Sequence, residues 1–207
     1  MTYNPDINHR RSIRLREYDY SSVGAYFVTI CTQGRECLFG DVADGEMCPN
    51  DAGRMVGEWW AKLPEKFPHV EVDESVVMPD HFHGIIILTD RAMDFACRGD
   101  TLCSPAVDCK GDTLCSPAVD CVDPPVKVPN GTMENSLGRV IQAFKSLTSV
   151  EYVRGVKECN WPPFSGRLWQ RNYYERVIRV DAELFGIREY IHFNPAKWAD
   201  DDEYSTK

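Results

Sequence analysis

The pair His81 and His83 is the first place in this sequence where side-chain types and spacing could do chemistry. The two histidines flank Phe82, and residues at i and i+2 of a strand project from the same face. Neutral imidazole is a common ligand of divalent metals, so two imidazoles on one strand would form half of a small catalytic metal site. The alternative is a pair of strand histidines hydrogen-bonded within a polar seam of the sheet.

A second pair, Tyr190 and Asn194, lies in a segment with helical periodicity. Apolar residues recur at helical spacing from Leu184 to Ile191, and Pro195 disfavours the helical conformation at Asn194, so we expect a helix that ends near there. Tyr190 and Asn194 are then neighbours at i and i+4. A phenol one turn before a carboxamide would bring a nucleophile and a third metal ligand to the two histidines. Otherwise Tyr190 is a core tyrosine of an amphipathic helix.

The segments around the histidines are typical of a buried central strand. Val76 and Val77 precede the pair and the apolar run Ile85 to Leu88 follows it, and β-branched residues favour strands. A further strand is predicted from Val70 to Val77, either paired with the histidine strand or continuous with it as one bent run.

The remaining elements complete an α+β pattern. We expect strands at Tyr26 to Thr32 and Tyr173 to Val180. Helices are expected at Met55 to Leu63, where Pro64 and Pro68 close the helix, and at Ser136 to Thr148. Asp181 is expected to cap the tyrosine helix. This order of elements predicts a ferredoxin-like sandwich, with an antiparallel sheet carrying the His-x-His strand and a C-terminal helix carrying the tyrosine.

Length and composition favour a single cytoplasmic domain. The chain has 207 residues, enough for one sizeable core, and we expect one catalytic domain over residues 1–207. It has no apolar run long enough for a membrane span, and its N-terminus lacks a hydrophobic signal region. The nine cysteines lack zinc-ribbon spacing, which indicates free thiols in a reducing compartment.

A variable insertion is predicted at residues 91–132. It contains a direct repeat, residues 97–108 and 109–120, whose two copies differ only by Arg98 and Lys110. Two copies are too few for a solenoid, so we expect a disordered loop. Its cysteines recur at six-residue intervals, which disfavours a zinc site because zinc ligands are usually closer pairs.

The charge is unevenly distributed along the chain. The net charge is −9, yet residues 138–180 hold eight basic and three acidic side chains, whereas residues 40–96 hold four basic and twelve acidic ones. A protein with one basic face can bind nucleic acid despite an acidic total. The alternative is an ordinary solvated surface.

Taken together, several blocks of the sequence resemble the REP-associated tyrosine transposases of the HUH endonuclease superfamily. The blocks span nearly the whole chain in the family's order: Arg10 to Leu15, Gly24 to Gln33, Met78 to His83, Phe144 to Ser146, Leu168 to Glu175 and Glu189 to Lys197. The combination is far more specific than any single block, and the resemblance also implies the ferredoxin-like fold.

The resemblance implies an enzyme that cleaves and rejoins single-stranded DNA at palindromic hairpins through a covalent 5′-phosphotyrosine. Tyr190 would be the nucleophile, and His81, His83 and Asn194 would hold Mg²⁺ or Mn²⁺. Asn194 departs from the glutamine common in the transposases proper. The expected DNA contacts are Arg10, Arg11, Arg14, Arg16, Lys145 and Arg171. Related enzymes act as dimers or as monomers, so a homodimer is one expectation.

Other functions and other nucleophiles compete with this hypothesis. A domesticated hairpin-binding protein that no longer cuts is the main alternative, followed by a replication or conjugation initiator of the same superfamily. Tyr173 and Tyr174 are rival nucleophiles by residue type, which we interpret as strand packing or DNA stacking. His192 lies about 160° around the helix from Asn194, so we do not expect it in the site.

Overall fold

The computed structural model describes residues 18–90 and 135–198. Four arginines of the first block lie outside the described residues: Arg10, Arg11, Arg14 and Arg16. The predicted insertion at residues 91–132, with its repeat, also lies outside them.

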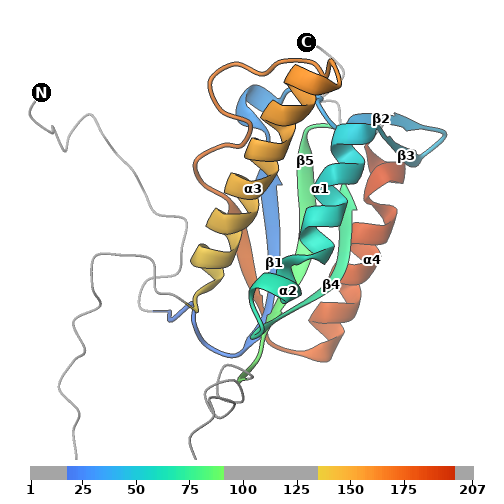
Figure 1. The fold of residues 1–207 in the computed structure, drawn as a ribbon. Coiled ribbons are helices and arrows are strands. Elements are labelled where there is room, and N and C mark those ends of the chain that lie inside the picture. Colours follow the sequence, from blue (N-terminus) through green and yellow to red (C-terminus); the bar gives the residue numbers. More distant parts are fainter. Residues whose placement is uncertain (1–17, 91–134, 199–207) are drawn as a thin grey trace, which may run out of the picture.

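A four-stranded sheet organises the fold (Figure 1). Its strands are β1 (Gly24–Cys31), β4 (Val70–Val77), β5 (His81–Leu88) and β6 (Tyr174–Ile178), in the spatial order β4-β5-β1-β6. All neighbouring strands pair antiparallel. Helix α1 (Asp51–Ala61) connects β1 to β4, and α3 (Leu137–Glu158) lies between β5 and β6. This is the split β-α-β arrangement of a ferredoxin-like fold, so the predicted fold class is confirmed.

Shorter elements and a fourth helix complete the fold. A 3-10 turn, η1 (Gln33–Arg35), follows β1 and leads into a hairpin of β2 (Gly40–Ala43) and β3 (Glu46–Pro49); α2 (Leu63–Lys66) follows α1, and α4 (Asp181–Lys197) ends the described chain. Within the described ranges, no helix combines the length and apolar character needed to cross a membrane. The four described cysteines, Cys31, Cys37, Cys48 and Cys159, are free thiols, as predicted.

Two cores lie on opposite faces of the sheet. Helices α1 and α3 cover one face and α4 covers the other (Figure 1). Alternation along β5 divides its side chains between them. Phe82 and Ile86 belong to the larger core under α1 and α3, whereas Ile85 packs with Ile187 and Ile191 under α4. His81 and His83 share the parity of Ile85, so both histidines face α4.

The structure corrects several predicted boundaries. Pro64 does not close α1 but starts α2, where it stands in the first turn and its missing N–H costs nothing. Helix α3 ends at Glu158 rather than near Thr148. Asp181 is the first residue of α4, not its cap, because Val180 holds that position with no side-chain cap bond. Strands β4 and β5 are a pair and not one bent run.

Pro195 lies inside α4 and does not end it. The helix continues to Lys197, and the backbone N–H of Trp198 donates to the Pro195 carbonyl at 3.2 Å. Pro195 is buried, and a proline this close to the end of a helix removes only one backbone hydrogen bond.

Gly84 is required where β5 passes beneath Trp60. A Cβ at Gly84 would lie 2.5 Å from Trp60 Cζ2, and this buried indole is held between Phe82 and Phe144 at centroid distances of 4.6 and 5.3 Å. We therefore expect Gly84→Ala to lower the free energy of unfolding by about 1–3 kcal/mol through overpacking, as measured by urea denaturation.

Gly57→Ala is the matched control for this substitution. Its added Cβ would meet only Val77 Cγ2, at 3.9 Å, and alanine favours a helix by about 1 kcal/mol over glycine. The control should therefore be neutral or stabilising. Equal unfolding midpoints for the two variants would contradict the close approach of Trp60 to β5.

Candidate active site

Two hydrogen bonds, one with Thr29 and one with Asp80, orient the histidine pair. Thr29 on β1 faces His83 across the sheet register, and its Oγ1 lies 2.8 Å from His83 Nδ1. Asp80, fully buried just before β5, places Oδ1 2.6 Å from His81 Nδ1. A carboxylate only accepts, so His81 Nδ1 donates the proton. Each ring thus uses Nδ1 for the protein and directs Nε2 toward α4.

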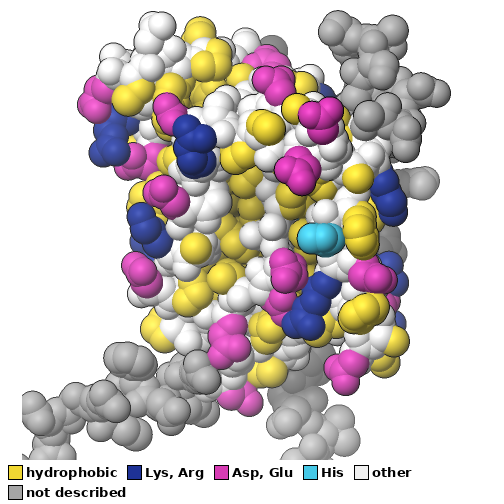
Figure 2. Space-filling model, turned by 90° about the vertical axis from the view of Figure 1, so that its right-hand side faces the viewer, with side chains coloured by type: hydrophobic (Ala, Val, Ile, Leu, Met, Phe, Trp, Pro, Cys, Tyr) yellow, Lys and Arg dark blue, Asp and Glu magenta, His cyan; other side chains and the backbone are white. Residues whose placement is uncertain are grey.

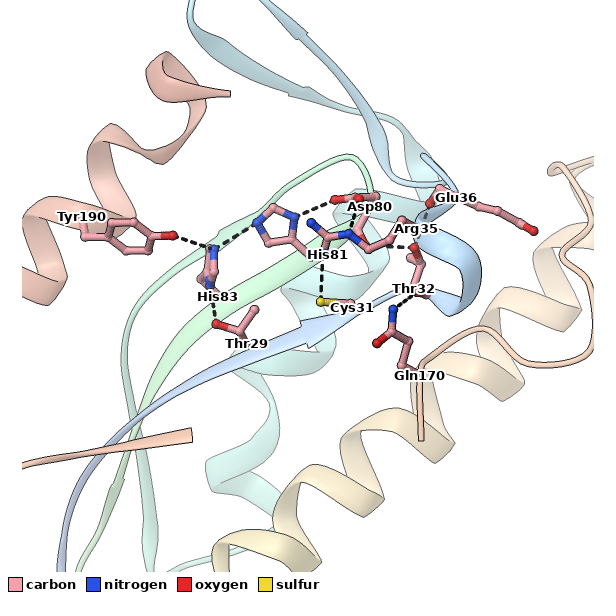
Figure 3. A network of polar contacts seen from close by, with 10 residues as sticks. All are labelled: Thr29, Cys31, Thr32, Arg35, Glu36, Asp80, His81, His83, Gln170 and Tyr190. Carbon is pink, nitrogen blue, oxygen red and sulfur yellow. Dashed lines mark hydrogen bonds and ion pairs between the residues drawn. The ribbon is translucent and has the colours of Figure 1, made fainter. Parts of the chain in front are cut away.

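The two Nε2 atoms lie 2.9 Å apart, and Figure 3 shows the two rings joined end to end through them. In the neutral tautomer of His81 that donates from Nδ1, Nε2 carries a lone pair. His83 has two options, since the Thr29 hydroxyl can donate or accept. His83 Nε2–H can donate to His81 Nε2, or Nδ1–H can donate to Thr29 and leave two lone pairs facing each other. The second state suits a shared cation.

Burial keeps His83 neutral. Desolvation, and then the charges of His81 and Arg35, lower the pKa of His83 to about 2. Only a neutral imidazole offers the lone pair that a metal needs. Protonation therefore does not compete with ligation by His83 at physiological pH.

Helix α4 brings Tyr190 and Asn194 to the same place. The Tyr190 hydroxyl lies 3.5 Å from His83 Nε2, at the outer limit of a hydrogen bond, and the phenol ring stands edge-on to His83 and Phe27 at centroid distances of 5.3 and 5.9 Å. Asn194 is buried one turn later, whereas Tyr190 is 41 % exposed. Tyr190 thus contacts the histidine pair, and Asn194 lies one turn further along the same helix.

All four predicted residues line one cavity of about 640 Å³. Its wall is mostly polar and, within the part of the chain that the structure describes, includes two cations but no carboxylate: Thr29, Cys31, Arg35, His81, His83, Gln170, Tyr174, Tyr190, Asn194, Lys197 and Trp198. The indole of Trp198 lies over His81, with ring centroids 5.6 Å apart. A cavity with cationic walls and an exposed phenol suits an anionic substrate that the phenol attacks.

The donor set is compatible with a divalent cation. Two ligand atoms at adjacent corners of an octahedron with bonds of about 2.1 Å are about 3.0 Å apart, close to the 2.9 Å between the Nε2 atoms. No group of three His, Cys, Asp or Glu side chains among the described residues could hold a metal. Asn194 supplies an amide oxygen in the wall of the same cavity, which is suited to serve as a third ligand.

Arg35 is a site residue that sequence reasoning missed. It has a positive φ of 59°, after Gly34 at 70°, a conformation uncommon for a residue with a side chain. Its Nε pairs with Asp80 Oδ2 at 2.9 Å and its Nη1 donates to Cys31 Sγ at 2.8 Å. Figure 3 shows the guanidinium between Asp80 and Cys31. No motif marks this arginine, because only the turn of η1 brings it to the histidine strand.

The basic stretch of the sequence does not form one face. Lys145, Arg167 and Arg171 line a groove beside α3, whereas Arg154 pairs with Glu151 at 2.8 Å in a different groove. Arg176 forms an ion pair with Glu183 on α4. The face in Figure 2 shows basic side chains scattered among acidic and hydrophobic ones. DNA contacts of Lys145 and Arg171 stay predictions.

The rival tyrosines occupy different environments. Tyr173 is buried and lies under the ammonium group of Lys145, which is 5.4 Å from the ring centroid. Tyr174 is 59 % exposed and lines the cavity with Tyr190. His192 is exposed on α4 and is not among the cavity residues. Packing therefore accounts for Tyr173, while Tyr174 faces the site.

The fold and the cavity define a ferredoxin-like α+β domain with a His-x-His strand facing a tyrosine-bearing helix. The chain is 35 % identical over 205 residues to an uncharacterized protein of Haemophilus influenzae, covering 98 % of this chain and 97 % of that protein. It therefore belongs to the same family as that Haemophilus protein. No protein-family model matches the chain.

Two solved structures are similar at low identity. A REP-associated tyrosine transposase bound to a REP hairpin has a TM-score of 0.48 and 18 % identity, with coverage of 89 % of this chain and 73 % of that one. An inferred transposase from Deinococcus radiodurans R1 has a TM-score of 0.37 and 14 % identity, with coverage of 86 % and 95 %. TM-scores under 0.5 do not transfer activity or ligands to this chain.

Proposed function

We propose that this protein is a metal-dependent endonuclease and strand transferase for single-stranded DNA that acts at palindromic hairpins through a covalent phosphotyrosine. One observation carries the proposal: a half-exposed phenol, two imidazoles with converging Nε2 atoms and a buried carboxamide line a single cavity. Tyr190 and His83 are 107 positions apart in the chain, yet their polar atoms lie 3.5 Å apart. The sequence blocks that resemble the tyrosine transposases supply the substrate class.

In the proposed step, Tyr190 Oη attacks the phosphorus of a phosphodiester. The bond between tyrosine oxygen and phosphorus forms while the bond from phosphorus to the 3′-oxygen breaks. The phenol transfers its proton to solvent water and the departing 3′-oxygen takes one up from water, so no oxidant or reductant is needed. The phosphotyrosine keeps the energy of the broken bond, and the same site can rejoin strands by the reverse attack.

The protein positions the reacting groups through the contacts behind the histidines. Asp80 and Thr29 fix the two imidazole rings, and Asn194 lies in the wall of the same cavity. Mg²⁺ or Mn²⁺ held by His81, His83 and Asn194 would polarise the phosphate and stabilise the leaving 3′-oxygen. Arg35 lies in the same wall and adds a fixed positive charge beside the phosphate oxygens.

A cleavage assay tests the function directly. The purified protein is incubated with single-stranded hairpin oligonucleotides taken from the flanks of its own gene, labelled at either end. We expect an SDS-resistant adduct that carries the 3′-labelled fragment, together with a 5′-labelled fragment ending in an extendable 3′-hydroxyl. Binding without either product would support the alternative, a hairpin-binding protein that does not cut.

Removal of divalent metal is expected to stop cleavage and leave binding. EDTA should abolish the adduct, and added Mn²⁺ should restore it at a lower concentration than Mg²⁺, because imidazole suits Mn²⁺ better than the oxygen-preferring Mg²⁺. The measurement is adduct yield against metal concentration. Full cleavage in EDTA would mean that the histidine pair serves only the structure.

A further inference from the structure

We propose that the groove beside α3 is a second DNA-binding surface, which holds unpaired nucleotides of the strand that continues from the scissile phosphate. The inference rests on the proposed function. The groove has a volume of about 590 Å³ and lies between α3 and the segment 164–171. Figure 1 shows the chain between α3 and β6 returning alongside the helix.

The walls of the groove are apolar and partly exposed. Val150 and Val153 on α3 are 64 % and 39 % exposed, although a long helix would normally present polar residues to water. The half-buried Phe164 and the buried Trp169 also line the groove. Apolar and aromatic surfaces of this kind contact the faces of unpaired bases with little dependence on sequence.

Among the described residues, the groove has charges of only one sign. Its charged lining residues in residues 18–90 and 135–198 are Lys145, Arg167 and Arg171, with no aspartate or glutamate. The comparable groove between α1 and α3 is lined by four acidic residues together with Arg54, Lys62 and Arg154. In a chain with a net charge of −9, a groove free of carboxylates is suited to a polyanion.

Gln170 joins the groove to the active site, because it lines both cavities. It is firmly held there: its N–H donates to the Cys31 carbonyl at 2.9 Å, and its Nε2 donates to the Thr32 carbonyl at 3.1 Å. Lys145 Nζ adds bonds to the Gln170 and Asn172 carbonyls at 3.0 and 2.8 Å. A strand leaving the scissile phosphate past Gln170 would therefore enter a preformed groove.

Unpaired nucleotides fit this combination better than the stem of a hairpin. A stem presents phosphates and groove edges but keeps its base faces stacked, so the apolar wall would have no partner. Single-stranded nucleotides offer both phosphates for the arginines and base faces for Val150 and Val153.

The test compares two double variants that each remove two positive charges. Arg167→Ala/Arg171→Ala alters the groove, and the control Lys62→Ala/Arg154→Ala alters the groove between α1 and α3. Both are made in the Tyr190→Phe background, so that binding is measured without cleavage. The probes are a hairpin oligonucleotide alone and the same hairpin with single-stranded extensions of increasing length on either side of the cleavage position.

For the extended probes, we expect the groove variant to lose about tenfold in affinity and to lower the slope of log K against log salt by about 1.4, at roughly 0.7 per lost phosphate contact. The control variant should keep the affinity and the salt slope of the parent protein after correction for net charge. The groove variant should keep both quantities when the probe is the bare hairpin. Thermal melting of each protein verifies that the fold is retained.

Three results would overturn the proposal. Equal losses in both double variants would show a general charge effect, and a loss for the bare hairpin as large as for the extended probes would assign the groove to the stem. Unchanged affinity of the groove variant for the extended probes, with an adduct still formed by the wild-type protein, would refute this inference alone. Absence of any adduct from the wild-type protein would instead refute the proposed function.

Discussion

Tyr190→Phe is expected to eliminate the covalent protein–DNA adduct while preserving the fold and the DNA affinity. The substitution removes only the phenolic oxygen, which lies 3.5 Å from His83 Nε2, and leaves the ring packed edge-on against Phe27. Removing a nucleophile commonly lowers a rate by about 10⁶-fold, which would put cleavage below detection. Adduct yield and hairpin affinity are measured on the same preparation.

Tyr174→Phe is the matched control for the nucleophile. Tyr174 lines the same cavity and is 59 % exposed, so it is the second phenol within the site. We expect the control to form the adduct, because it is the Tyr190 hydroxyl that lies 3.5 Å from His83 Nε2. Peptide mapping of the wild-type adduct identifies the modified tyrosine. DNA on the peptide that contains Tyr174 would reverse the assignment.

His81→Ala should lower cleavage by more than about 100-fold while changing hairpin affinity little. Loss of a residue that hydrogen-bonds to a metal ligand lowers metal affinity or activity by about 10–100-fold. Loss of the ligand itself should lower cleavage by at least as much. The DNA affinity should persist because phosphate contacts with basic side chains supply most of it. Cleavage rate and binding are compared at saturating Mn²⁺.

The stability of this variant needs its own check. Removing His81 deprives the fully buried Asp80 of one partner, which costs about 1–3 kcal/mol, although the ion pair with Arg35 remains. His81→Gln retains a polar side chain and should fold better yet still fail to cleave. His192→Ala, on the exposed side of α4, should cleave normally. Equal loss of binding and cleavage in His81→Gln would mark the pair as structural.

Local patterns were sufficient to find the elements that carry the site. The parity of strand side chains placed His81 and His83 on one face, and the i, i+4 relation placed Tyr190 beside Asn194, as the cavity lining shows. These relations hold because strand and helix repeats fix side-chain direction within a few residues. The same local rules were less reliable at element ends. At Pro64 and Pro195, helix position and burial decided the outcome.

Contacts between distant segments were not readable from any pattern. Arg35 reaches Asp80 only because η1 turns back after β1, and Tyr174 joins the cavity because β6 pairs Tyr174 with Thr29. The sequence left open whether the basic residues of 138–180 share one binding face, and in the structure Arg154 lines a different groove from Arg167 and Arg171. Sequence alone thus determined which residue types could do chemistry and on which face of their own element they lie. Tertiary structure decided which faces meet, because register, helix packing and loop path depend on contacts between residues far apart in the chain.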